Sequence, residues 1–126
     1  MTTIALPIAL ALLAALAILQ TLVALGLPYG RFVWGGEHRV LPRRLRLGSA
    51  ATVLVYAGIA VVLRARAGAL PGETGTVTIV LTWVTFTMFA LSVPLNAVSR
   101  SLAERWTMTP TSVALAASTL IIALGL

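Results

Sequence analysis

The chain has 126 residues, of which 60% are hydrophobic and 10% are charged, and its mean hydropathy is +1.04. These values lie outside the range of soluble globular domains and predict a single integral membrane domain over residues 1–126. The formal net charge is +6, which would favour nucleic acid in a soluble protein. Here the charges lie between long apolar stretches, so we expect no nucleic-acid partner.

The charged residues are of few kinds. All nine basic residues are arginine, the acids are Glu37, Glu73 and Glu104, and the chain has no lysine, aspartate or cysteine. It therefore lacks a Schiff-base amine, a thiolate nucleophile and a thiolate metal ligand. His38 is the only histidine, and all three glutamates fall at positions that we expect to be loops, with no carboxylate at bilayer depth. We therefore expect no metal site, no cofactor and no catalytic residue.

Long charge-poor stretches predict an all-α fold with four transmembrane helices in an up-down bundle. Each stretch approaches or exceeds the roughly 17 to 25 residues that a helix needs to cross a bilayer. The expected helices, in chain order, cover residues 3–27, 42–66, 76–98 and 110–126. The start of the chain, Met1-Thr2-Thr3, lacks the basic region of a signal peptide, so we expect the first helix to be retained.

Proline and glycine predict the helix boundaries. The first helix is expected to end before Pro28 and Gly30, and the second to begin at Pro42, which suits a first helical position. Pro94 is expected to kink the end of the third helix. Thr109 followed by Pro110 predicts the start of the fourth helix.

The distribution of arginine predicts the orientation in the membrane. The first and third connections hold seven arginines, against two beside the second connection. Short arginine-rich loops stay on the cytoplasmic side. We therefore expect both termini outside, in a multi-pass protein of the bacterial cytoplasmic (inner) membrane. Arginines on the expected inner face that could contact anionic lipid headgroups or an acidic partner are Arg39, Arg43, Arg44, Arg46, Arg100 and Arg105.

The first connection also holds a polar cluster. Trp34, Glu37 and His38 lie near two glycines, and Glu104 follows in the other inner loop. A histidine beside carboxylates could act as a general base, but a loop-closing histidine is the simpler interpretation. Either reading predicts that these four residues gather on the inner side.

A polar stripe follows one face of the third expected helix, at spacings of four, three, seven and four residues. In a membrane, such hydroxyl and amide groups either hold helices together or line a path for a small solute. Gln20 and Tyr56 are candidate partners for the stripe. Its members are Thr78, Thr82, Thr85, Ser92 and Asn96.

The third connection, NAVSRSLAERWTMTP, contains Ser101 and Glu104 at capping-box spacing and predicts a short surface helix before the fourth span. Together with WGGEHRVLP and the Leu-Arg pair before the second helix, this stretch resembles a family of small four-helix integral membrane proteins from high-GC (actinobacterial-type) bacteria. The resemblance covers nearly the whole chain. It implies a topology and no particular chemistry.

These observations favour a non-enzymatic membrane protein that is a subunit of a homo-oligomer or of a larger membrane complex, with an arginine-rich cytoplasmic face. One alternative is a homo-oligomeric channel or exporter of a small solute or ion. Since a four-helix bundle fills its own core with side chains, its path would lie between subunits. A second alternative is an interfacial enzyme acting on lipid, with His38 and Glu104 in acid-base roles.

Overall fold

The computed structural model describes all 126 residues and is all-α, with four long helices. These are α1 (Thr2–Ala24), α2 (Arg43–Arg66), α3 (Thr76–Ala97) and α4 (Leu102–Leu124). Two short 3-10 turns, η1 (Gly30–Phe32) and η2 (Trp34–Gly36), lie in the connection between α1 and α2. All four long helices have the length and apolar composition needed to cross a membrane. The structure therefore supports a multi-pass membrane protein built as a four-helix bundle.

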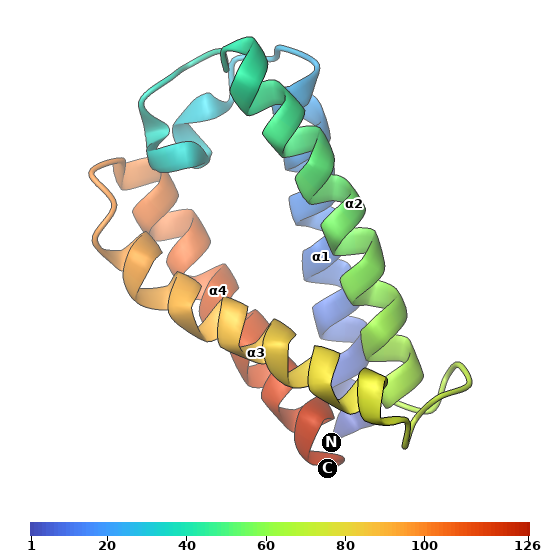
Figure 1. Cartoon of the computed structure of the whole chain (residues 1–126). Coiled ribbons are helices and arrows are strands. Elements are labelled where there is room, and N and C mark those ends of the chain that lie inside the picture. Colours follow the sequence, from blue (N-terminus) through green and yellow to red (C-terminus); the bar gives the residue numbers. More distant parts are fainter.

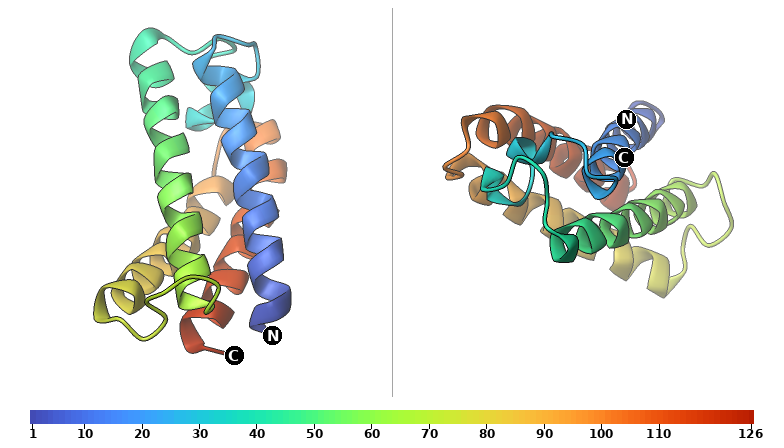
Figure 2. Two further views of the ribbon diagram at one scale, coloured as in Figure 1. Left: turned by 90° about the vertical axis from the view of Figure 1, so that its right-hand side faces the viewer. Right: turned by 90° about the horizontal axis from the view of Figure 1, so that it is seen from above.

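The helices are arranged as two hairpins, α1 with α2 and α3 with α4, and α1 also packs against α4. Figure 1 shows that the hairpins meet at the end that carries both termini and diverge toward the other end, where η1 and η2 lie between them. The two ends of the chain are joined by a hydrogen bond of 3.2 Å from the Thr2 N–H to the Leu126 carbonyl. We call this end of the bundle the terminal end and the opposite one the connection end. Two further directions of view show the same arrangement (Figure 2).

The apolar core is divided in two. The larger part contains Ala5, Ala9 and Leu13 of α1, at a spacing of four residues that places them on one helix face. The same cluster includes residues of the other three helices: Ile59 and Leu63 of α2, Phe89 of α3, and Leu115 and Ile122 of α4. The smaller part joins Val23, Val33 and Leu41 beneath the connection between α1 and α2.

The first helix ends earlier than expected, at Ala24. The N–H of Leu27 bonds to the carbonyl of Leu22, and the N–H of Gly26 bonds to the carbonyl of Val23. This is the Schellman pattern, which requires a left-handed residue, and Gly26 supplies it with a φ of +93°. The helix therefore stops at Gly26, before it reaches Pro28.

The fourth helix begins earlier than expected, at Leu102 instead of Pro110, and the separate surface helix does not exist. Ser101 is the N-cap, and its Oγ accepts a hydrogen bond of 3.2 Å from the Glu104 N–H. This cap begins one continuous helix in which Pro110 is an interior residue. Proline is tolerated inside transmembrane helices, because neighbouring groups satisfy the carbonyl that it frees. The same holds for Pro94, since α3 continues through it to Ala97.

Candidate functional site

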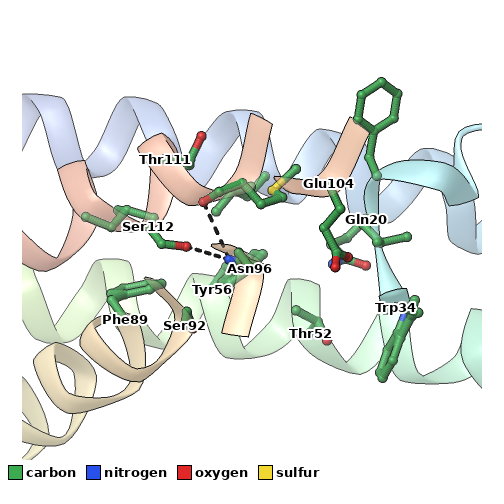
Figure 3. A pocket seen from close by; sticks show the side chains of 15 residues that line it. Gln20, Trp34, Thr52, Tyr56, Phe89, Ser92, Asn96, Glu104, Thr111 and Ser112 are labelled. Carbon is green, nitrogen blue, oxygen red and sulfur yellow. Dashed lines mark hydrogen bonds between the residues drawn. The ribbon is translucent and has the colours of Figure 1, made fainter. Parts of the chain in front are cut away.

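A pocket of about 260 Å³ lies between the two hairpins (Figure 3). Its wall includes Phe89 and Leu115 of the larger core and Val33 of the smaller one, so the pocket separates the two parts. All four long helices contribute to the wall. Its polar side chains, apart from the Trp34 indole, are Gln20, Thr52, Tyr56, Ser92, Asn96, Glu104, Thr111 and Ser112.

Glu104 is the only charged residue in this wall. It is 8% exposed and lies in the first turn of α4, so the expectation that every glutamate lies in a loop is wrong for this one. In a capping box its carboxylate would turn back to the Ser101 N–H. Instead, the Ser101 N–H bonds to the Ser99 Oγ at 3.2 Å, and the Glu104 Oε2 accepts a bond of 3.1 Å from the Gly35 N–H.

The α1–α2 connection covers the pocket through a tight turn. Trp34, Gly35 and Gly36 have φ values of +52°, +75° and +72°, and the first of these is a conformation that non-glycine residues seldom adopt. Trp34 is held in it by a 2.9 Å hydrogen bond from its Nε1 to the Oγ of Ser49, a fully buried residue of α2. Strain that is held in this way often marks a functional site.

A second contact ties the same connection to α4. The hydroxyl of Ser101 donates a hydrogen bond of 2.6 Å to the carbonyl of Arg31. A Cβ atom at Gly36 would overlap the Ser101 side chain, so only glycine permits this approach. The connection is therefore joined to α2 through Trp34 and to α4 through Gly35 and Arg31.

The pocket presents several hydrogen-bond acceptors. The hydroxyls of Thr52, Ser92 and Thr111 donate to carbonyls one turn earlier in their own helices, which leaves their oxygen lone pairs free. The Asn96 Nδ2 donates a hydrogen bond of 2.8 Å to the Ser112 Oγ. The Gln20 Oε1 is buried without a partner.

The polar stripe on α3 faces the interior but divides in two. Thr82 and Thr85 are buried, and both donate to carbonyls of α3 itself. Thr78 is half-buried, and of the five members only Ser92 and Asn96 line the pocket. Only Asn96 bonds to another helix, through Ser112 and, at 3.5 Å, the Met108 carbonyl. The stripe is thus not one continuous line of interhelical bonds.

The polar cluster of Trp34, Glu37, His38 and Glu104 is also divided. Trp34 and Glu104 line the pocket, whereas Glu37 and His38 do not. Glu37 is exposed and His38 is half-buried. The structure therefore does not bring the proposed acid-base pair, His38 and Glu104, to the same cavity.

Two of the six arginines named from the sequence have structural contacts. The Arg46 Nε donates a hydrogen bond of 2.8 Å to the Ala24 carbonyl and so caps the last turn of α1. Arg105 donates through Nε and Nη2 to the Ser99 carbonyl, at 3.1 and 2.8 Å. The remaining four are exposed to the surroundings: Arg39, Arg43, Arg44 and Arg100.

A groove of about 470 Å³ lies where α1 ends and α2 begins. Arg43 and Arg46 contribute guanidinium groups, and four apolar residues complete the wall: Ala24, Leu25, Leu47 and Ala50. Such a groove combines positive charge with apolar surface at one end of a membrane helix. The combination suits an anionic amphiphile.

Several pocket residues could not be found from the sequence. The sequence does not identify Ser112, because a helix that starts at Pro110 leaves the register of α4 against α3 undefined. Thr52 and Thr111 carry no signal beyond being polar residues in a span. Comparisons of this chain with protein-family models, with curated proteins and with solved structures found no match.

Proposed function

We propose that this chain is a non-enzymatic membrane subunit whose arginine-rich connection end faces the cytoplasm and binds anionic phospholipid. The observation that carries the proposal is the groove between α1 and α2, in which Arg43 and Arg46 stand beside apolar residues. A headgroup phosphate would contact the guanidinium groups, and an acyl chain would lie against Leu25 and Leu47.

Charge at this end supports the proposal. Arg39 in the α1–α2 connection, Arg44 in the first turn of α2 and Arg100 in the α3–α4 connection are exposed. Each arginine near an anionic leaflet contributes about 1 kcal/mol of attraction. Arginines in the first turn of α2 also oppose the helix dipole, which a bound phosphate would compensate. The inner leaflet of a bacterial cytoplasmic membrane is the corresponding location, because arginine-rich loops remain inside.

The test is native mass spectrometry of the purified protein with phosphatidylglycerol and with phosphatidylcholine. The double variant Arg43→Gln/Arg44→Gln is chosen because neither residue holds a contact within the chain comparable to that of Arg46. We expect it to lose phosphatidylglycerol adducts that the wild type retains. The matched control is Arg64→Gln, an exposed arginine beside the second connection. Equal retention by the double variant would refute the proposal.

The same spectra test the assembly part of the proposal. A subunit is expected in a fixed ratio with copies of itself or with other polypeptides. Loss of a polypeptide partner in the arginine variant, with phosphatidylglycerol adducts unchanged, would identify an acidic protein as the ligand of this end. A monomer in mild detergent under all conditions would contradict the subunit proposal.

A further inference from the structure

The pocket between the hairpins shares no residue with the arginine groove, so it requires a separate explanation. Its wall carries one carboxylate, that of Glu104, and no arginine. A buried charge without an opposite charge is costly in a low-dielectric environment. The pocket is therefore electrostatically suited to a cation.

The Glu104 carboxylate lies where an anion is favoured, and it lines the pocket with room for a ligand. Glu104 lies in the first turn of α4, where the helix dipole stabilises an anion. The Glu104 Oε2 accepts a hydrogen bond of 3.1 Å from the Gly35 N–H. A carboxylate can accept hydrogen bonds from further donors. Neither interaction neutralises the charge.

Besides donor groups on Gln20, Tyr56 and Ser112, the rest of the wall offers several acceptors. Ser92 and Thr52 direct their hydroxyl hydrogens to carbonyls of their own helices, and both hydrogen bonds of Asn96 use its Nδ2, which leaves Oδ1 as an acceptor. The unpartnered Gln20 Oε1 adds a buried acceptor. A ligand that matches this wall carries several N–H donors.

Aromatic side chains give the wall a further preference. Trp34, Tyr56 and Phe89 belong to it, and aromatic rings attract organic cations through their negative faces. The volume of about 260 Å³ suits a small organic molecule better than a bare metal ion. No group of three or more histidine, cysteine, aspartate or glutamate residues is placed to hold a metal ion.

We propose that the pocket between the two hairpins binds a small primary ammonium ion, with the Glu104 carboxylate as its counter-charge. The amine N–H groups would donate to Glu104, to the Asn96 Oδ1 and to the hydroxyl oxygens, and the alkyl part would lie against the aromatic residues. The site lies within one chain, whereas the channel or exporter alternative places its path between subunits.

The experiment is isothermal titration calorimetry of the full chain in nanodiscs, with n-butylammonium chloride as the probe. Sodium butyrate and n-butanol supply an anion and a neutral molecule of similar size, and sodium chloride keeps the ionic strength equal. We expect saturable heat from butylammonium alone. Equal binding of butanol, equal binding of butyrate, or no saturable heat from butylammonium would overturn the proposal.

The decisive variant is Glu104→Gln, which keeps an acceptor for the Gly35 N–H and removes the charge. We expect the affinity for butylammonium to fall at least about thirtyfold, because removing one member of a buried charge pair has effects of this size. The control is Glu37→Gln, an exposed glutamate in the connection, which is expected to bind as the wild type does. Unchanged affinity in Glu104→Gln would overturn the assignment.

A second variant keeps the test valid if Glu104→Gln does not fold. Ser92→Leu fills the pocket without leaving a partner unsatisfied, since the Ser92 hydroxyl bonds only to its own helix backbone. Thr87→Leu is the control, because Thr87 makes the same kind of bond on the exposed face of α3. We expect Ser92→Leu to abolish binding and Thr87→Leu to retain it. Binding by Ser92→Leu would place the amine elsewhere and overturn the proposal.

Discussion

The Gly35 N–H donates a hydrogen bond of 3.1 Å to the Glu104 Oε2. The two residues are 69 positions apart in the sequence, and this bond joins the α1–α2 connection to the first turn of α4. The same carboxylate lines the pocket between the hairpins. One side chain therefore helps to hold the connection over the bundle and also supplies the charge inside the pocket.

Replacing Glu104 with alanine is expected to destabilise the protein by about 1–3 kcal/mol, because the Gly35 N–H loses its acceptor. Thermal unfolding in detergent, followed by circular dichroism, measures the change. Glu37→Ala is the control and should stay within about 0.5 kcal/mol of the wild type, since Glu37 is exposed. Equal effects in the two variants would show that the Gly35 bond contributes nothing to stability.

Alanine at the two adjacent glycines of the connection should have unequal effects. Both residues have positive φ, which costs an alanine about 1–2 kcal/mol. At Gly35 a Cβ atom meets open space, whereas at Gly36 it overlaps the Ser101 side chain. We expect Gly36→Ala to unfold at a lower temperature than Gly35→Ala. The reverse order would contradict the close approach of the connection to α4.

Ser101→Ala should destabilise the protein by more than the loss of an N-cap, which costs about 1 kcal/mol, because Ser101 also donates to the Arg31 carbonyl. The measurement is again thermal unfolding. Thr87→Ala provides a comparison, since the Thr87 hydroxyl bonds only within α3. A Ser101→Ala variant as stable as Thr87→Ala would mean that α4 does not begin at this cap.

Asn96 and Ser112 should be energetically coupled, because the Asn96 Nδ2 of α3 donates a hydrogen bond of 2.8 Å to the Ser112 Oγ of α4. A double-mutant cycle with Asn96→Ala and Ser112→Ala is expected to give a coupling energy of about 0.6 to 1.7 kcal/mol, the range for such bonds in membranes. Asn96 paired with Thr119, whose hydroxyl bonds within α4, should show none. Additive effects of Asn96→Ala and Ser112→Ala would argue against this register of the two helices.

The orientation can be tested on a chain that has no cysteine of its own. We expect Arg39→Cys to react with a membrane-impermeant maleimide only in inverted vesicles, and Glu73→Cys only in right-side-out vesicles, since the arginine-rich connections should remain inside. Both positions are exposed. The opposite labelling pattern would place the arginine-rich end outside and refute the cytoplasmic lipid proposal.

The architecture could be predicted because it depends on local composition. A bilayer requires long apolar helices, and the expected second and third helices agree with α2 and α3 to within one residue at each end. Helix ends that depend on capping were predicted less well. α1 ends at the left-handed Gly26, where the N–H groups of Gly26 and Leu27 bond to preceding carbonyls. Ser101 caps α4, which begins at Leu102, eight residues before Pro110. For α4, Pro110 is the weaker boundary signal, because the Ser101 cap, with Glu104 three residues later, lies in the same stretch of sequence and begins the helix.

The pocket was decided by tertiary structure alone. The sequence by itself determined that polar side chains such as Ser92 and Asn96 share one face of α3, since helical periodicity is a local property. It did not determine that they lie opposite Glu104, because that position depends on where α4 begins and on the divergence of the two hairpins. Likewise, the sequence predicts a loop at Glu104, whereas the fold places this residue in the first turn of α4 and brings the Gly35 N–H to its carboxylate. The environment of a buried charge is set by neighbours that are distant in the chain, and only the packing of the helices determines which residues those neighbours are.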